Sequence, residues 1–128
     1  MKKIFLAILT SSLMFGAFLQ NKTYNCDTVG ISFKDGNQTR NVPNNTKTNK
    51  KLKKILKNLY SIKLKLDKKM LNVNAGKSSD TLAYLRKYKN LDVYITGDKK
   101  VIIFLDYNKT QAGMMIPSLK TMIYYQCK

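Results

Sequence analysis

Residues 48–67, TNKKLKKILKNLYSIKLKLD, change their hydrophobic period halfway along, and this change decides the expected fold. From Thr48 to Tyr60 the apolar residues follow the spacing of one helix face, with lysines on the remaining arc. The apolar face consists of Leu52, Ile55, Leu56 and Leu59. From Ser61 onward the period is two, which is typical of a half-buried strand. We therefore expect an amphipathic helix, docked by its four apolar residues, followed directly by a strand.

The rest of the chain reads mainly as short strands separated by turn residues. The expected elements are a hairpin over 28–33 and 38–42, a strand over 70–74, a short helix over Asp80–Tyr88, a hairpin over 91–96 and 101–107, and a closing strand over 121–127. In the short helix, Leu82 and Leu85 are three residues apart and are expected to face inward. The predicted fold class is α+β: an antiparallel sheet of five to seven short strands with both helices packed on it.

The N-terminus has the features of a secretory signal peptide. Lys2 and Lys3 precede an apolar run from Ile4 to Leu19, which is too short and too interrupted for a comfortable membrane span. We expect a signal over residues 1–20, cleaved between about 17 and 22, and one small basic domain over residues 21–128 with no transmembrane span. The expected location is periplasmic or secreted. A lipid anchor on Cys26 is the alternative, but the residues before it do not form a lipobox.

The chain has two cysteines, Cys26 near the expected mature start and Cys127 as the penultimate residue. In an oxidising compartment they can form one disulfide that ties the two ends of the domain together. A redox-active or metal-binding pair is the alternative. It lacks support because the spacing is not C-x-x-C and the chain has no histidine.

The formal net charge is +17, and removal of Lys2 and Lys3 with the signal lowers it by two, to +15. Such a charge attracts anionic surfaces in a salt-dependent way. The expected anionic-surface contacts are Lys50, Lys51, Lys53, Lys54 and Lys57 on the amphipathic helix. Two plainer explanations stay open: the lysine excess reflects an AT-rich genome, and the helix is an ordinary docked helix with solvated lysines. Specific nucleic-acid recognition is not expected.

The titratable residues argue against an enzyme. Histidine and glutamate are absent, and all seven acids are aspartates, of which Asp35, Asp67, Asp98 and Asp106 fall in expected turns. General acid–base catalysis usually relies on histidine or on a carboxylate pair with separated pKa values. No nucleophile or phosphate-binding motif is present. We therefore predict no catalytic, cofactor-binding or metal-binding residues.

Four N-x-T triplets begin at Asn21, Asn37, Asn44 and Asn108. Two of them also carry an acid two residues before the asparagine, Asp35 before Asn37 and Asp106 before Asn108. This longer pattern resembles the acceptor of bacterial N-linked glycosylation, and both copies fall in expected hairpin turns. We predict glycosylation at Asn37 and Asn108. The alternative is that the two aspartates only stabilise turns.

Three short features resemble the small periplasmic inhibitors of c-type lysozyme, which are compact β-barrels. They are Tyr24-Asn25-Cys26 near the mature start, the terminal Cys127, and Thr96-Gly97-Asp98 in a late turn. The Ser-Gly-x-x-Tyr loop of that family is absent, Thr96 stands where the family has its inhibitory lysine, and the amphipathic helix is foreign to the family barrel. The resemblance implies lysozyme inhibition.

The expected function is that of an exported, non-catalytic binding or envelope-associated protein. Its expected partner is an unidentified protein or an anionic component of the envelope, and no cofactor is expected. The alternatives are a lysozyme-inhibitor-like protein and a binder of anionic envelope polymers or lipids.

Overall fold

The computed structural model describes residues 18–128, so most of the expected signal peptide over residues 1–20 lies outside the described residues. The elements are β1 (Thr23–Asp35), β2 (Gln38–Pro43), α2 (Asn49–Leu56), the 3-10 turn η1 (Lys57–Leu59), β3 (Ser61–Asp67), β4 (Met70–Ala75), β5 (Ser78–Tyr88), β6 (Leu91–Ile95), β7 (Ile102–Asp106), β8 (Gln111–Ile116), the 3-10 turn η2 (Pro117–Leu119) and β9 (Thr121–Cys127).

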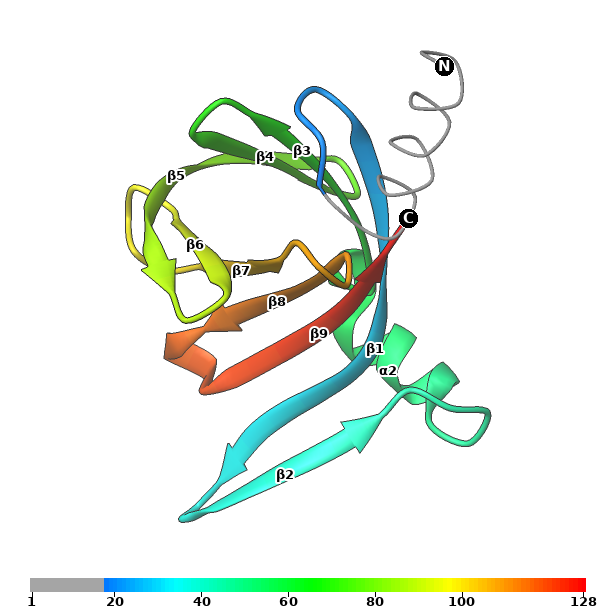
Figure 1. Cartoon of the computed structure of the whole chain (residues 1–128). Coiled ribbons are helices and arrows are strands. Elements are labelled where there is room, and N and C mark those ends of the chain that lie inside the picture. Colours follow the sequence, from blue (N-terminus) through cyan, green and yellow to red (C-terminus); the bar gives the residue numbers. More distant parts are fainter. Residues whose placement is uncertain (1–17) are drawn as a thin grey trace.

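The strands form one antiparallel sheet that closes into a barrel (Figure 1). Strands β3 to β9 pair in sequence order, and β9 returns to pair with β1, which itself pairs with β3. Eight strands therefore complete the barrel, while β2 pairs with β1 outside it. One edge of the long strand β1 pairs with two strands. Residues 23–27 pair with β3, and residues 30–35 pair with β2. Its other edge pairs with β9, with a register shift between Thr28 and Gly30 that bends the strand.

The expected α+β fold with five to seven strands is therefore wrong. A sheet that stays open must bury its apolar face under helices or a second sheet, whereas a closed sheet buries that face against itself. Here the core lies inside the barrel. Its fully buried members come from strands all around the barrel and include Leu64, Leu71, Leu82, Ile103, Leu105, Ile123 and Tyr125.

The expected helix over Asp80–Tyr88 is also wrong, because this segment is part of β5. Leu82 is buried, but Leu85 is 52% exposed, so the two leucines do not share a face. The register between β5 and β6 shifts between Tyr84 and Arg86, which indicates a β-bulge. Residues three apart lie on one face of a helix but on opposite faces of a strand, so the spacing of Leu82 and Leu85 imitated a helix while only Leu82 points inward.

The amphipathic helix is present but shorter than expected, because α2 ends at Leu56 and continues only as the turn η1. Lys57 adopts a left-handed φ of 51°, which ends the regular helix. Leu52 and Leu56 are buried in the core cluster, and Leu59 packs against that cluster. The strand expected directly after the helix is β3, whose residues alternate between exposed and buried. Among residues 18–128, no helix has the length and apolar character needed to cross a membrane.

Candidate functional site

The candidate site lies where α2 and η1 meet one end of the barrel (Figure 1). Leu59 lines a hollow of about 220 Å³ together with the strand residues Val73, Ile103 and Met114. The Tyr125 hydroxyl on β9 donates a hydrogen bond to the Leu59 carbonyl oxygen at 2.5 Å. The turn after the helix is thus held to the barrel by both apolar packing and a hydrogen bond to a buried side chain.

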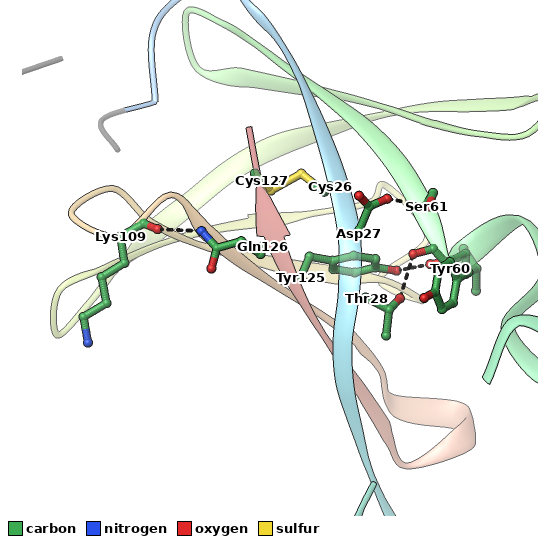
Figure 2. The surroundings of a disulfide bond; sticks show 10 residues. Cys26, Asp27, Thr28, Tyr60, Ser61, Lys109, Tyr125, Gln126 and Cys127 are labelled. Atoms are coloured by element: carbon green, nitrogen blue, oxygen red, sulfur yellow. Dashed lines mark hydrogen bonds between the residues drawn. A yellow bond between two sulfur atoms is a disulfide. The ribbon is translucent and has the colours of Figure 1, made fainter. Parts of the chain in front are cut away.

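A polar network fixes the two chain segments that flank α2. The Asn44 and Asn49 amides donate hydrogen bonds to the Tyr60 hydroxyl at 2.6 and 2.8 Å. The Asn44 amide also donates to the Thr28 carbonyl oxygen at 2.6 Å. The Thr28 hydroxyl in turn donates to the Tyr60 carbonyl oxygen at 2.7 Å, a contact that Figure 2 shows. Because both flanks are tied to β1, the helix has a fixed orientation on the barrel.

The five lysines named from the sequence are all exposed; they are Lys50, Lys51, Lys53, Lys54 and Lys57. Helical geometry distributes them over two flanks. On one flank Lys53 and Lys57 line an open hollow of about 390 Å³ with Asn58, Tyr60, Ser61 and Gly76. On the other flank Lys51 lies one turn before Ile55, and Lys54 lies on the solvent-facing arc next to that flank. The five predicted lysines are therefore all solvent-exposed on one docked helix, but they point to two of its flanks.

An apolar groove of about 370 Å³ runs along the Ile55 flank of the helix, and we call it the Ile55–Leu119 groove. Its lining residues come from α2, η1, β1, β8, η2 and β9; they are Ile31, Phe33, Lys34, Ile55, Leu56, Leu59, Ile116, Leu119, Thr121 and Ile123. Ile55 is 57% exposed and Leu119 is 65% exposed. Among the large apolar side chains in the described part of the chain, these are the two most exposed.

Sequence reasoning missed this groove. Ile55 was expected to dock the helix, but it projects from the edge of the apolar face, and Leu119 lay in a segment with no assigned role. The available signal was that Leu52, Leu56 and Leu59 already form a complete inward stripe, which leaves Ile55 to one side.

The predicted disulfide is confirmed: Cys26 of β1 and Cys127 of β9 are bonded (Figure 2). The two cysteines lie directly opposite each other in the β1–β9 register. The bond therefore lies across the pair of strands that closes the barrel. This location leaves both sulfurs committed to the fold.

The two candidate glycosylation sites lie in exposed turns, Asn37 between β1 and β2 and Asn108 between β7 and β8. The Asp106 carboxylate accepts a hydrogen bond from the Asn108 backbone N–H at 3.2 Å, which is also the turn role that the alternative assigns to it. The Asn44 amide, in contrast, is already engaged by Thr28 and Tyr60. The Asn37 and Asn108 side chains are thus more accessible to a glycosylating enzyme than the Asn44 side chain.

The two predicted glycosylation triplets also differ in the exposure of their threonines. Thr110, the threonine of the Asn108 triplet, is buried, and its backbone oxygen accepts a hydrogen bond from the Cys127 N–H at 2.9 Å. Thr39, the threonine of the Asn37 triplet, is exposed. Asn21 is exposed, and its backbone N–H donates to the Leu66 carbonyl oxygen.

A second polar cluster lies within the barrel wall. The hydroxyls of Tyr94 and Tyr107 are 3.2 Å apart, and the Tyr84 hydroxyl donates a long 3.5 Å hydrogen bond to Asp92. Burial raises the pKa of Tyr107 and also that of Tyr94. Both phenols therefore stay protonated and neutral near pH 7, where they act as hydrogen-bonding core residues and not as bases.

The turn that carried the family resemblance is organised internally. Thr96 is buried, and its hydroxyl donates to the Asp98 carboxylate at 2.7 Å. This bond, together with the Lys100 backbone N–H, lowers the pKa of Asp98. The Thr96 side chain is thus directed into the turn and not toward a partner.

The fold and the site define a class: a small antiparallel β-barrel, closed by a disulfide across its seam, with a lysine-bearing helix fixed beside an apolar groove. No protein-family model, curated protein or solved structure matches this chain. Within residues 18–128, no group of three or more histidine, cysteine, aspartate or glutamate side chains is placed to hold a metal ion.

Proposed function

We propose that this chain is an exported, non-catalytic binding protein that associates with an anionic surface of the cell envelope through α2, and that it is glycosylated at Asn37 and Asn108. The observation that supports this function most directly is the placement of five exposed lysines on a helix whose other face is buried. A fixed array of like charges meets an anionic surface without the entropy cost of ordering a flexible segment.

The charge of the whole molecule supports the same association. Lysines and arginines outnumber acids by 24 to 7. Attraction of this kind weakens as salt shortens the Debye length from about 30 Å at 0.01 M to about 8 Å at physiological ionic strength. Each lysine near an anionic bilayer contributes about 1 kcal/mol. The lysines of α2 that face the bilayer therefore each strengthen the attachment by about this amount.

The test compares two variants with equal loss of charge. The first replaces Lys50, Lys51, Lys53, Lys54 and Lys57 with glutamine, and the second replaces the exposed lysines Lys63, Lys65, Lys87, Lys89 and Lys109 of other elements. Binding is measured by co-sedimentation with vesicles that contain phosphatidylglycerol and with vesicles of phosphatidylcholine alone. We expect salt-sensitive binding to the anionic vesicles, lost in the helix variant and largely kept in the matched variant.

Equal losses in the two variants would mean that net charge alone drives binding, as the genome-composition explanation predicts. Capture of one defined protein at high salt, with no vesicle binding, would favour a protein-binding module instead.

A further inference from the structure

The Ile55–Leu119 groove extends the proposed attachment from electrostatic contact to insertion. We propose that the protein sits on an anionic phospholipid bilayer with Ile55 and Leu119 inserted into the interface, while Lys34, Lys51 and Lys54 contact the phosphates of the surrounding lipids. This inference rests on the proposed function and adds its orientation and its lipid chemistry.

The first argument is the pairing of the two exposed apolar residues. Single exposed apolar side chains are common on protein surfaces and need no explanation. Ile55 of α2 and Leu119 of η2, however, come from segments more than 60 residues apart and line the same groove. The groove floor is made of the apolar residues Ile31, Ile116 and Ile123. A continuous apolar surface of this shape gains free energy when acyl chains replace water.

The second argument is the charge around the groove. Lys34 lines it directly. On the helix, Lys51 lies one turn before Ile55 on the same flank, and Lys54 lies on the adjoining solvent-facing arc. None of the groove's lining residues is acidic, and the neighbouring Asp35 forms an ion pair with Arg40 at 3.0 Å. Lysines around a protruding apolar centre match the layered chemistry of an anionic bilayer, where phosphates surround the entrance to the hydrocarbon.

The third argument is rigidity. Leu52 and Leu56 anchor α2 in the core, and Tyr60 is tied to Asn44 and Asn49 on the opposite side of the helix. Pro117 begins η2 and restricts its backbone. Ile55 and Leu119 are thus presented without reordering of the chain, which lowers the entropy cost of insertion.

The same charges argue against a second copy of this chain as the occupant. A symmetric contact through the groove would bring two sets of Lys34, Lys51 and Lys54 together, and like charges in an interface are strongly unfavourable. An anionic lipid neutralises these lysines instead.

The chain contains no tryptophan, so one introduced tryptophan is a unique fluorescent reporter. We would prepare the chain after removal of the signal peptide and without further truncation. Each protein would carry one substitution: Ile55→Trp, Leu119→Trp or, as the control, Leu85→Trp. Leu85 is 52% exposed on β5 and belongs to a different part of the barrel wall. With phosphatidylglycerol vesicles, we expect a blue shift and quenching by brominated acyl chains for the first two reporters and neither effect for the third.

A companion experiment measures affinity. Ile55→Ser combined with Leu119→Ser should weaken binding to the anionic vesicles by about tenfold or more, while Met70→Ser combined with Leu85→Ser, which also removes two exposed apolar side chains, should leave it unchanged. Circular dichroism confirms that each variant is folded before it is compared.

Three results would overturn the inference. The first is undiminished binding by the serine variant of the groove, which would leave the electrostatic function intact but exclude insertion. The second is a blue shift with monomeric fatty acid and none with vesicles, which would make the groove a site for free ligands. The third is equal tryptophan shifts at all three positions. Failure of every form of the protein to bind anionic vesicles would instead reject the proposed function.

Discussion

Cys26 and Cys127 face each other across the β1–β9 seam, and their disulfide joins residues 101 positions apart. The first strand of the barrel and the last are therefore linked at the point where the sheet closes. In the chain-entropy account, a loop of this length stabilises the folded state by about 4–5 kcal/mol.

We expect Cys26→Ser combined with Cys127→Ser to lower the free energy of unfolding by about 4 kcal/mol, because the unfolded chain regains the freedom of its ends. Denaturant titration of the oxidised protein and the variant measures the difference. Peptide mapping without reductant checks the pairing in protein isolated from an oxidising compartment. Two free thiols in that material would refute the structural role of the pair.

We expect Leu56→Asp to unfold or severely destabilise the domain, because it places an unpaired charge among the core residues that Leu56 contacts. Replacing the exposed Lys53 and Lys57 with glutamine should leave the melting curve nearly unchanged. Thermal unfolding followed by circular dichroism compares the three proteins. A normal melting curve for Leu56→Asp would show that α2 is not docked in solution.

We expect glycans on Asn37 and Asn108, and none on Asn21 or Asn44, in a host with bacterial N-glycosylation. Asp106→Ala should abolish the modification at Asn108 while leaving that at Asn37. Intact mass and glycopeptide mapping identify each site. An unmodified protein in a host shown to glycosylate other exported proteins would leave both aspartates as turn residues only.

The two sites should also differ in timing. Because Thr110 is buried in the folded barrel, a glycosylating enzyme can bind the Asn108 triplet only before the barrel folds. The Asn37 triplet remains exposed after folding. Treating the folded, unglycosylated protein with the glycosylating enzyme should therefore modify Asn37 alone, and the reduced, unfolded protein should accept two glycans. Equal modification of both sites in the folded protein would contradict this order.

We expect stability to fall above about pH 10, the ordinary pKa of tyrosine. Burial raises the pKa of Tyr107 and Tyr125 in the folded state, so from that pH upward the unfolded chain loses protons that the folded chain retains. Below pH 10 both states hold these protons and the contribution is constant. Denaturant midpoints across this range, together with the ultraviolet absorbance of tyrosinate, follow the effect, and Tyr107→Phe should reduce the slope. Titration of all tyrosines without loss of stability would contradict it.

The expected cleavage range, between about 17 and 22, determines whether the mature chain keeps Phe18. Phe18 is only 7% exposed, with its ring edge-on to Tyr107 at 5.6 Å and tilted against Tyr24 at 4.9 Å. Burial of a phenylalanine side chain is worth about 2 kcal/mol, so a chain that starts at Lys22 should be less stable than one that starts at Phe18 by about this amount. Mass spectrometry of the N-terminal peptide identifies the cleavage point. Equal unfolding free energies for the two forms would exclude a structural role for Phe18.

An eight-stranded barrel is common to many unrelated proteins, so the fold by itself does not test the resemblance to lysozyme inhibitors. Titration of a c-type lysozyme with the purified protein does test it. Retained muramidase activity at excess protein would remove that alternative.

Local patterns determined a large part of this structure. The change of period at Ser61 correctly predicted a helix followed by a strand, and turn residues correctly separated β1 from β2 and β6 from β7. The presence of just two cysteines left a single intrachain disulfide to predict. The helix, strand and turn predictions depend on residues that are neighbours in the sequence. The disulfide prediction depends on there being only two cysteines.

Tertiary structure alone decided that the sheet closes and that the groove exists. The pairing of β1 with β9 joins the two ends of the chain, and no periodicity within either strand specifies its partner. In β5 the period of two places Leu82 and Leu85 on opposite faces, so their helix-like spacing was misleading until the pairing of β5 with β4 and β6 was known. The Ile55–Leu119 groove likewise requires α2 and η2 to meet beside β1. Burial and exposure are set by contacts between distant segments, and hydrophobicity along the chain constrains those contacts without specifying them.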